Sequence, residues 1–219
     1  AGAAREEVHE DHLAGTGGAL TYGENEDGTT TTKLDTLFIS SRLMEAYRDT
    51  AERFYAIDSV KILKDEFASK NDLTIFYRKD EKIITEKSDT STKQPILWHQ
   101  NSQLTGDSIT IYLDSNKIKQ LDVDGTSFML SQNENYLERF DQTSSAQIKL
   151  FFADSKINRA EFYGNVFSIY FMYDGETENG LTKSNSATTT VMFEDSEVTE
   201  VRLYKNPVSE YYPEPQVKG

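Results

Sequence analysis

Residues 107–125 have the sequence DSITIYLDSNKIKQLDVDG, and the same pattern returns twice further along the chain. Thirty-nine residues later stands AQIKLFFADSKINRAEFYG, and forty-one residues after that stands ATTTVMFEDSEVTEVRLYK. The three copies align without a gap. Apolar residues fill four shared columns: Ile111, Leu150 and Val191; Leu113, Phe152 and Phe193; Ile118, Ile157 and Val198; Val123, Phe162 and Leu203. A repeat of this length predicts a stack of similar supersecondary units that share one core.

Each copy has the pattern of a β-hairpin. Ile109, Ile111 and Leu113 alternate with Thr110 and Tyr112, as in a strand with one buried face. Residues 114–116, with the sequence DSN, are good turn formers. The return strand then brings further apolar residues back to the same face, so one copy makes one hairpin.

Two irregularities recur within the copies. The spacing of three between Ile118 and Leu121 breaks strict alternation and is found again in the other two copies, which predicts a β-bulge just after the turn. Gly125 and Gly164 close the first two copies and predict a bend there, because a residue without Cβ lets the chain turn. The third copy has Lys205 in that place, so we expect its bend to differ.

Weaker copies precede these three. One is NDLTIFYRKDEKIIT from Asn71, which needs one inserted residue before Ile83, and another is FYAIDSVKIL from Phe54. Residues 41–53 could form an amphipathic helix, but their place between strand-like segments favours a further strand pair.

We therefore expect an all-β fold, a twisted β-jelly-roll or solenoid of stacked antiparallel hairpin repeats. It should span residues 36–213. We expect a flexible leader rich in Gly, Thr and acidic residues before it, over residues 1–35, and a short tail over residues 214–219.

Composition excludes several classes of function. The chain has 23 Lys and Arg against 37 Asp and Glu, a formal net charge of −14. Nucleic acids and anionic membrane surfaces attract cationic proteins, so neither is an expected partner. The absence of cysteine excludes disulfides, thiolate metal sites and a cysteine nucleophile.

No group of residues predicts catalysis, a metal or a cofactor. His9 and His12 stand three apart among acidic residues, but a solvated acidic terminus explains them better than a metal site. His99 has no nucleophile to serve and is expected in packing or on the surface. The acidic stretch Asp174–Gly180 lacks EF-hand spacing and is expected to be a solvated hairpin loop. We therefore expect a protein that is not an enzyme.

The abundance of apolar residues on one face of the repeat has two interpretations. The residues could simply fill a closed β-core, or the two walls of a stacked sheet pair could stand slightly apart and leave an apolar slot for acyl chains. On the second interpretation, the lipid-binding residues on the interior face are Leu73, Ile75, Ile109, Ile111, Leu113, Ile118, Val123, Ile148, Leu150, Phe152, Phe162, Val191 and Phe193.

Four short motifs resemble a known family. Pro95–Trp98 (PILW), Leu104–Asp107 (LTGD), the lysine-containing turn Asn116–Ile118 and the closing pair Tyr212–Pro213 look like the C-terminal region of OstA-like envelope proteins of Bacteroides-type bacteria. The segment ASKNDLTIFYRKDEKI from Ala68 is similar to the repeat unit of LptA-like domains. The resemblance covers residues 36–213 and departs from the family pattern at Lys205.

This resemblance implies a function without catalytic residues. It implies a twisted β-jelly-roll in the periplasm, or at the periplasmic face of the outer membrane, of a Gram-negative bacterium. There the chain would carry lipopolysaccharide, or another acyl lipid, through an apolar slot. The implied partners are other envelope transport proteins joined by edge-strand addition and further copies in a head-to-tail oligomer.

A different class of function remains open. A closed β-repeat scaffold could bind envelope proteins through its edge strands or through an aromatic column of Phe76, Tyr112 and Phe151. Co-purifying lipid, detected by native mass spectrometry, would distinguish the carrier from the scaffold.

Overall fold

The computed structural model describes residues 5–9, 14–16, 20–24, 30–34, 37–64, 67–87, 93–115, 117–194 and 197–217. Within these ranges the chain forms strands and one short helix: β1 (Arg5–His9), β2 (Ala14–Thr16), β3 (Leu20–Glu24), β4 (Thr30–Leu34), β5 (Leu37–Ser40), β6 (Leu43–Tyr47), β7 (Arg53–Lys64), β8 (Phe67–Tyr77), β9 (Lys82–Glu86), β10 (Ile96–His99), β11 (Ser102–Thr105), β12 (Ser108–Asp114), β13 (Lys117–Gln132), β14 (Phe140–Ala153), β15 (Lys156–Asp174), β16 (Thr177–Glu194), β17 (Glu197–Tyr204), β18 (Val208–Tyr212) and α1 (Glu214–Val217). The all-β fold is as predicted, and residues 41–53 contribute β6 and the start of β7 rather than a helix.

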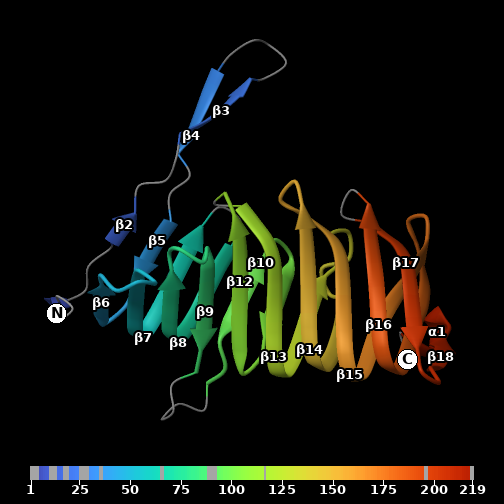
Figure 1. Cartoon of the computed structure of the whole chain (residues 1–219). Coiled ribbons are helices and arrows are strands. Elements are labelled where there is room, and N and C mark those ends of the chain that lie inside the picture. Colours follow the sequence, from blue (N-terminus) through green and yellow to red (C-terminus); the bar gives the residue numbers. More distant parts are fainter. Residues whose placement is uncertain are drawn as a thin grey trace.

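One antiparallel sheet of 16 strands folds into two facing walls. Figure 1 shows its hairpins following one another along a single array, from β6 in blue to β17 in red. The long strands β7, β8, β13, β14, β15 and β16 run through both walls and pair with different neighbours in each. The result is a jelly-roll built as a solenoid of stacked antiparallel hairpins.

The two walls can be defined by residue ranges. Wall A consists of residues 43–57, 73–86, 108–124, 147–163 and 188–204. Wall B consists of residues 37–40, 60–70, 96–105, 127–145, 166–186 and 208–212. A single cluster of buried side chains joins them, and it includes Leu97 and Leu104 of wall B and Ile109 and Leu121 of wall A.

The chain passes between the walls at a line of corners. Here the register shifts, for example between Ile57 and Val60 and between Tyr163 and Val166. Gly125 and Gly164 have φ of 94° and 79°, and a Cβ at Gly164 would lie 2.7 Å from the Cβ of Ala146. The predicted glycine bends are thus confirmed as corners, at which an L side chain would be strained and crowded.

The corner at Lys205 differs in one respect. Lys205 and the next residue, Asn206, also adopt left-handed backbone, with φ of 62° and 58°. However, β13 and β15 continue through their corners, whereas β17 ends at Tyr204 and a separate strand, β18, begins at Val208. The left-handed backbone of the other corners therefore recurs here, but the strand does not continue through the corner.

Serine side chains support the corners on the alternate strands. The hydroxyls of Ser41, Ser145 and Ser186 each donate to the backbone carbonyl two residues further on, at 3.0, 3.0 and 3.1 Å. Such bonds satisfy carbonyl groups that the register shift removes from the ladder. This recurring serine belongs to the repeat, although sequence analysis did not identify it.

The predicted bulge occurs in all three strong copies. The register shifts between Tyr112 and Leu113 in the first copy, between Phe151 and Phe152 in the second, and between Met192 and Phe193 in the third. Each bulge returns the apolar residues on both sides of the hairpin turn to the same face.

The leader contributes to both walls at one end. β1 pairs with β6 of wall A, β2 pairs with β5 of wall B, and β3 and β4 form a separate two-stranded sheet. The flexibility expected for residues 1–35 stays a prediction. Of the described residues, none belongs to a helix long and apolar enough to cross a membrane.

Candidate functional site

The inner face of wall A is apolar across most of its width. Strand pairing aligns one row of residues next to the corners: Met44, Ala56, Thr74, Thr85, Ile109, Val123, Ile148, Phe162, Thr189 and Leu203. A second row lies further from the corners: Ala46, Phe54, Phe76, Ile83, Ile111, Leu121, Leu150, Ala160, Val191 and Val201. Beyond it lie the pairs Leu113–Ile118, Phe152–Ile157 and Phe193–Val198. Wall A therefore offers a hydrocarbon surface along the array.

The inner face of wall B changes in chemistry along its length. Its central row is Ile39, Ile62, Ser69, Leu97, Leu104, Met129, Thr143, Ser168, Ser184 and Ser209. Up to Met129 the row is apolar except for Ser69, and from Thr143 onward it carries only hydroxyls. The interior thus has two parts, which we call the apolar half, up to Met129 of wall B, and the hydroxyl half beyond it.

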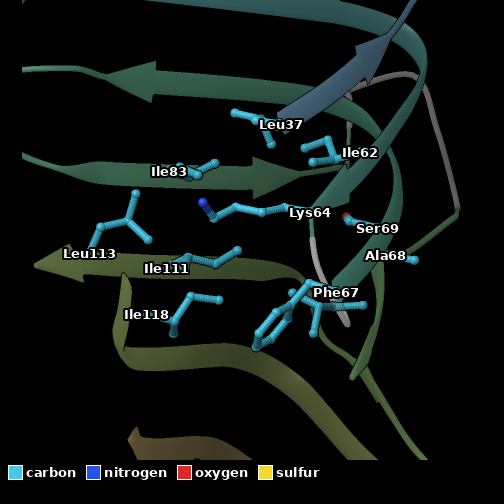
Figure 2. Close-up of a pocket in the computed structure, with 11 residues that line it drawn as sticks. Leu37, Ile62, Lys64, Phe67, Ala68, Ser69, Ile83, Ile111, Leu113 and Ile118 are labelled. Atoms are coloured by element: carbon cyan, nitrogen blue, oxygen red, sulfur yellow. The ribbon is translucent and has the colours of Figure 1, made fainter. Parts of the chain in front are cut away.

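A cleft opens between the walls in the apolar half, on the side away from the corners. Wall B lines it with Leu37, Ile62, Lys64, Phe67, Ala68, Ser69 and Leu97, and wall A with Ile83, Ile111, Leu113 and Ile118. Figure 2 shows these side chains converging from both walls, with Lys64 lying among them. The cleft leaves about 30 Å³ of free space, enough for one or two water molecules. A preformed small-molecule site has roughly 300–1,000 Å³.

Three rings bridge the walls next to this cleft. Phe67 stacks on His99, with ring centroids 4.2 Å apart, and Phe152 of wall A approaches His99 edge-on at 5.7 Å and Phe67 at 6.1 Å. His99 is only 3% exposed, so the packing interpretation of this histidine is confirmed. We call Phe67, His99 and Phe152 the aromatic bridge. It holds the walls together where the interior would otherwise be open.

Eleven of the thirteen residues predicted for the interior face lie on it. Six are buried: Ile109, Ile111, Val123, Ile148, Leu150 and Phe162. Five are half-buried and packed against the core: Leu113, Ile118, Phe152, Val191 and Phe193. Their contact with lipid stays a prediction.

Two of the thirteen, Leu73 and Ile75, lie on the outer face. Their neighbours in sequence, Thr74 and Phe76, are the buried residues of this strand. The prediction was wrong because the weak copy was aligned one residue out of step, and a shift of one residue moves every side chain to the opposite face. The same error affected the predicted aromatic column of Phe76, Tyr112 and Phe151. Phe76 lies in the interior, and its sequence neighbour Tyr77 lies in the outer-face row with Tyr112 and Phe151.

Most of the wall B side of the cleft has no counterpart among the residues predicted from the sequence. Lys64 and Phe67 stand on either side of a hairpin turn, outside the aligned copies, and Leu97 belongs to a four-residue strand too short to show periodicity. Only the alternation of Val60 and Ile62 with Ser59 and Lys61 could have indicated an inward face here.

Two ionisable groups with altered pKa, Arg139 and Asp141, lie in the hydroxyl half. Arg139 is 5% exposed and pairs with Glu178 at 2.6 Å and with Glu214 of α1. The hydrogen bond that its guanidinium donates to the Glu214 carboxylate raises the pKa of Arg139. Burial raises the pKa of Asp141 to about 6, although its Oδ1 accepts a hydrogen bond from the Phe171 amide at 2.9 Å. These groups fasten the end of the array and include no nucleophile–base pair.

The possible metal ligands from the leader cannot be placed. His9 belongs to β1, whose side chains are not described, and His12 lies outside the described residues. In the part of the chain that is described, no three His, Cys, Asp or Glu residues gather as a metal site would require.

Comparison with known proteins gives one solved structure. No family model and no curated protein matches the chain. The structure is that of LptH from Pseudomonas aeruginosa, described as the LptA-homologous periplasmic component of the conserved lipopolysaccharide transport device. It is 12% identical, the match covers 68% of this chain and 95% of that one, and the TM-score is 0.49. The function proposed below therefore rests on the geometry and the sequence motifs of this chain.

Proposed function

We propose that this chain is a non-enzymatic, LptA-like carrier that shelters the acyl chains of a lipid between walls A and B. The observation that carries the proposal is the second row of wall A, which is apolar along the whole array and faces a cleft lined from both walls. A closed core needs no such opening on the side away from the corners.

The energetics favour acyl chains as cargo. Burying one methylene stabilises by about 0.8 kcal/mol, so a single lipid tail offers on the order of 10 kcal/mol before costs. An exposed ion pair with a headgroup contributes only roughly 0–1 kcal/mol. A protein of net charge −14 can therefore bind an anionic lipid provided that its tails are sheltered.

Loading requires the walls to separate. The free space of about 30 Å³ is far too small for a lipid tail. The aromatic bridge is the contact that must open, since Phe152 comes from wall A while Phe67 and His99 come from wall B. The walls are joined at the corners, so opening at the bridge widens the interior without breaking the ladder of hydrogen bonds.

The ends of the array suit transfer between molecules. β17 and β18 each pair with β16 on one side, and among the described residues nothing pairs with their other side. Val201, Val208 and Tyr211 are 46%, 59% and 52% exposed at this end. Strand addition there would extend the interior into a second copy or into another envelope transport protein.

The cargo proposed is lipopolysaccharide or another acyl lipid, and the place is the periplasm, or the periplasmic face of the outer membrane, of a Gram-negative bacterium. Membership of the Bacteroides-type OstA-like group belongs to the same proposal. It rests on the motifs at Pro95–Trp98 and Leu104–Asp107.

Photo-crosslinking tests the carrier directly. A photoreactive amino acid at Ile111 or Phe152 should capture lipid, because both side chains face the interior. The same group at Tyr112 or Phe151 provides a matched control, since each is the sequence neighbour on the outer face. Capture from the outer positions alone would reject the slot.

A scaffold that binds envelope proteins is the second candidate. It is favoured by the exposed edges of β17 and β18 and by an outer row in which Arg159 lies 4.0 Å from the ring of Phe151 and Lys82 lies 4.7 Å from that of Tyr77. If native mass spectrometry of the purified protein finds no lipid, and a peptide that pairs with β17 blocks partner binding, the scaffold is preferred.

A further inference from the structure

The outer face of wall B carries apolar side chains that the core does not use. Strand pairing places two rows of residues on this face, one running from Ser40 to Val208 and the other from Phe38 to Glu210. Apolar side chains gathered on an exposed face mark a site of contact with a protein or a membrane. The most exposed of them, at 46%, 57%, 38% and 59%, are Phe38, Leu63, Phe167 and Val208.

The charge of this face has the opposite sign to that of the chain. Its two rows contain three lysines and one carboxylate: Lys61, Lys70, Lys183 and Glu210. The two rows next to the corners on the outer face of wall A contain five acidic residues and two basic ones: Glu45, Glu86, Asp122, Asp124 and Glu161 against Lys149 and Arg202. The net charge of −14, which predicts no attraction to an anionic membrane, therefore does not describe the outer face of wall B.

Two of the lysines face each other directly. Lys61 of β7 is the ladder partner of Lys70 of β8, and both side chains are exposed. Like charges directly opposite on neighbouring strands destabilise a sheet. An anion that accepts hydrogen bonds from both ammonium groups would remove this repulsion, and a phosphate has the oxygens to do so.

We infer that the outer face of wall B docks on the surface of an anionic phospholipid bilayer, with Lys61 and Lys70 on a lipid phosphate and the apolar side chains in the headgroup region. A bilayer offers hydrocarbon and phosphate along one extended surface, and aromatic side chains such as Trp98 favour that interface. A second copy docked on the same face would bring lysines against lysines. The inference goes beyond the carrier and does not depend on it, because it uses the outer face and not the interior.

The one tryptophan of the chain reports on this face. Trp98 lies in the row from Phe38 to Glu210, and its Nε1–H donates to Oε1 of Gln103 at 3.0 Å. The whole chain is mixed with vesicles of phosphatidylcholine, or of phosphatidylcholine with phosphatidylglycerol, and the bound fraction is measured by sedimentation. We expect tighter binding to the anionic vesicles, with Trp98 emission shifted to shorter wavelength and quenched by brominated lipid.

Variants assign the binding to the face. Lys61→Gln with Lys70→Gln should weaken binding to the anionic vesicles by roughly fivefold per lysine, because each lysine near the surface contributes separately. Leu63→Gln should weaken binding to both kinds of vesicle. Lys117→Gln with Lys119→Gln is the matched control, since it makes the same change in net charge at two exposed residues of β13 in wall A, and it should bind as the unaltered chain does.

Four results would overturn the inference. They are no binding to the anionic vesicles, binding without a change in Trp98 emission, equal binding by the two double variants, and a dimer that forms without lipid and shows the same emission shift. Equal binding by the double variants would also be the result if lipid entered the cleft alone, so uptake into the interior is distinguished from docking.

Salt gives a second test on the unaltered chain. Raising it from about 50 to about 500 mM should weaken binding to the anionic vesicles and leave the weak binding to neutral vesicles unchanged. Equal salt dependence on the two kinds of vesicle would contradict the role of the lysines.

Discussion

The apolar half and the hydroxyl half of the interior have the same backbone and opposite chemistry on wall B. Leu97, Leu104 and Met129 face wall A in the first, whereas Thr143, Ser168 and Ser184 face it in the second. Wall A stays apolar in both. The hairpin repeat therefore fixes one wall, and the segments between repeats are free to make the other wall dry or polar.

This difference has an energetic consequence. In the apolar half, both walls contribute hydrocarbon and the core is closed by the aromatic bridge. In the hydroxyl half, wall B contributes hydroxyl groups instead, and the Thr143 hydroxyl donates to that of Ser168 at 3.2 Å. Stability should therefore reside in the apolar half, and four substitutions test this in order of expected effect.

The largest effect is expected in the apolar half. Leu104→Ala removes a side chain that is 1% exposed and should lower the free energy of unfolding by about 2–5 kcal/mol. Leu130→Ala, on the outer face of the same wall, is the control and should cost less. Urea denaturation followed by tryptophan fluorescence measures both. Equal costs would contradict the assignment of inner and outer faces.

Next comes the ion cluster that closes the hydroxyl half. Glu214→Gln removes one carboxylate from the buried Arg139 and should cost about 1–3 kcal/mol, because a buried charge loses part of its compensation. Glu200→Gln, in the exposed pair with Arg202, should have no measurable effect. Thermal unfolding of the two variants in parallel gives the comparison. An unchanged Glu214→Gln would show that α1 does not fasten the end of the array.

A pH-dependent gain is expected at Asp141. Its pKa is raised from 3.8 to about 6 by burial, so the folded state binds a proton more readily than the unfolded state and ionisation weakens the fold as pH rises from about 4 to 6. Asp141→Asn keeps the acceptor for the Phe171 amide and should stabilise by about 1–3 kcal/mol at pH 8. Urea titrations at pH 8 and pH 4 should show the gain at the first and little at the second. A gain independent of pH would contradict the raised pKa.

The smallest effect is expected within the hydroxyl half. Ser168→Ala removes a half-buried acceptor of Thr143 and should cost about 0.5–1.5 kcal/mol. Ser145→Ala, at a corner serine that is 8% exposed, should lower the free energy of unfolding by more, because the Gln147 carbonyl loses its hydrogen-bond donor. Hydrogen exchange of the flanking amides distinguishes the two, and a reversed order would show that the corner serines are dispensable.

The sequence carried enough information for wall A and little for wall B. Three gapless copies fixed the strands, turns and bulges of residues 107–204, since each apolar column returns to one row of the sheet. Wall B could not be predicted because its residues lie between the copies, and a run such as Thr143–Ser145 has no apolar alternation.

The errors near the start of the chain have a single physical cause. The β8–β9 hairpin pairs Phe76 with Ile83 and Tyr77 with Lys82 without the bulge found in the strong copies. The hairpin is also shorter, since Phe76 and Ile83 are seven residues apart whereas the corresponding pair Ile111 and Leu121 is ten apart. Alignment to the longer copies shifted β8 by one residue, which exchanged Thr74 and Phe76 for Leu73 and Ile75. The inward direction of Lys64 was beyond prediction, because a lysine that precedes two acidic residues at the end of a strand usually lies in solvent.

A staple across the aromatic bridge tests most directly whether lipid lies between the walls. The chain has no cysteine, so Phe67→Cys with Phe152→Cys supplies one pair of thiols that a short bifunctional reagent can join. The double variant should bind dodecanoate before crosslinking, lose that binding when the walls are joined, and recover it when a cleavable linker is cut. Unchanged affinity in the joined protein would place the ligand outside the walls and contradict the carrier.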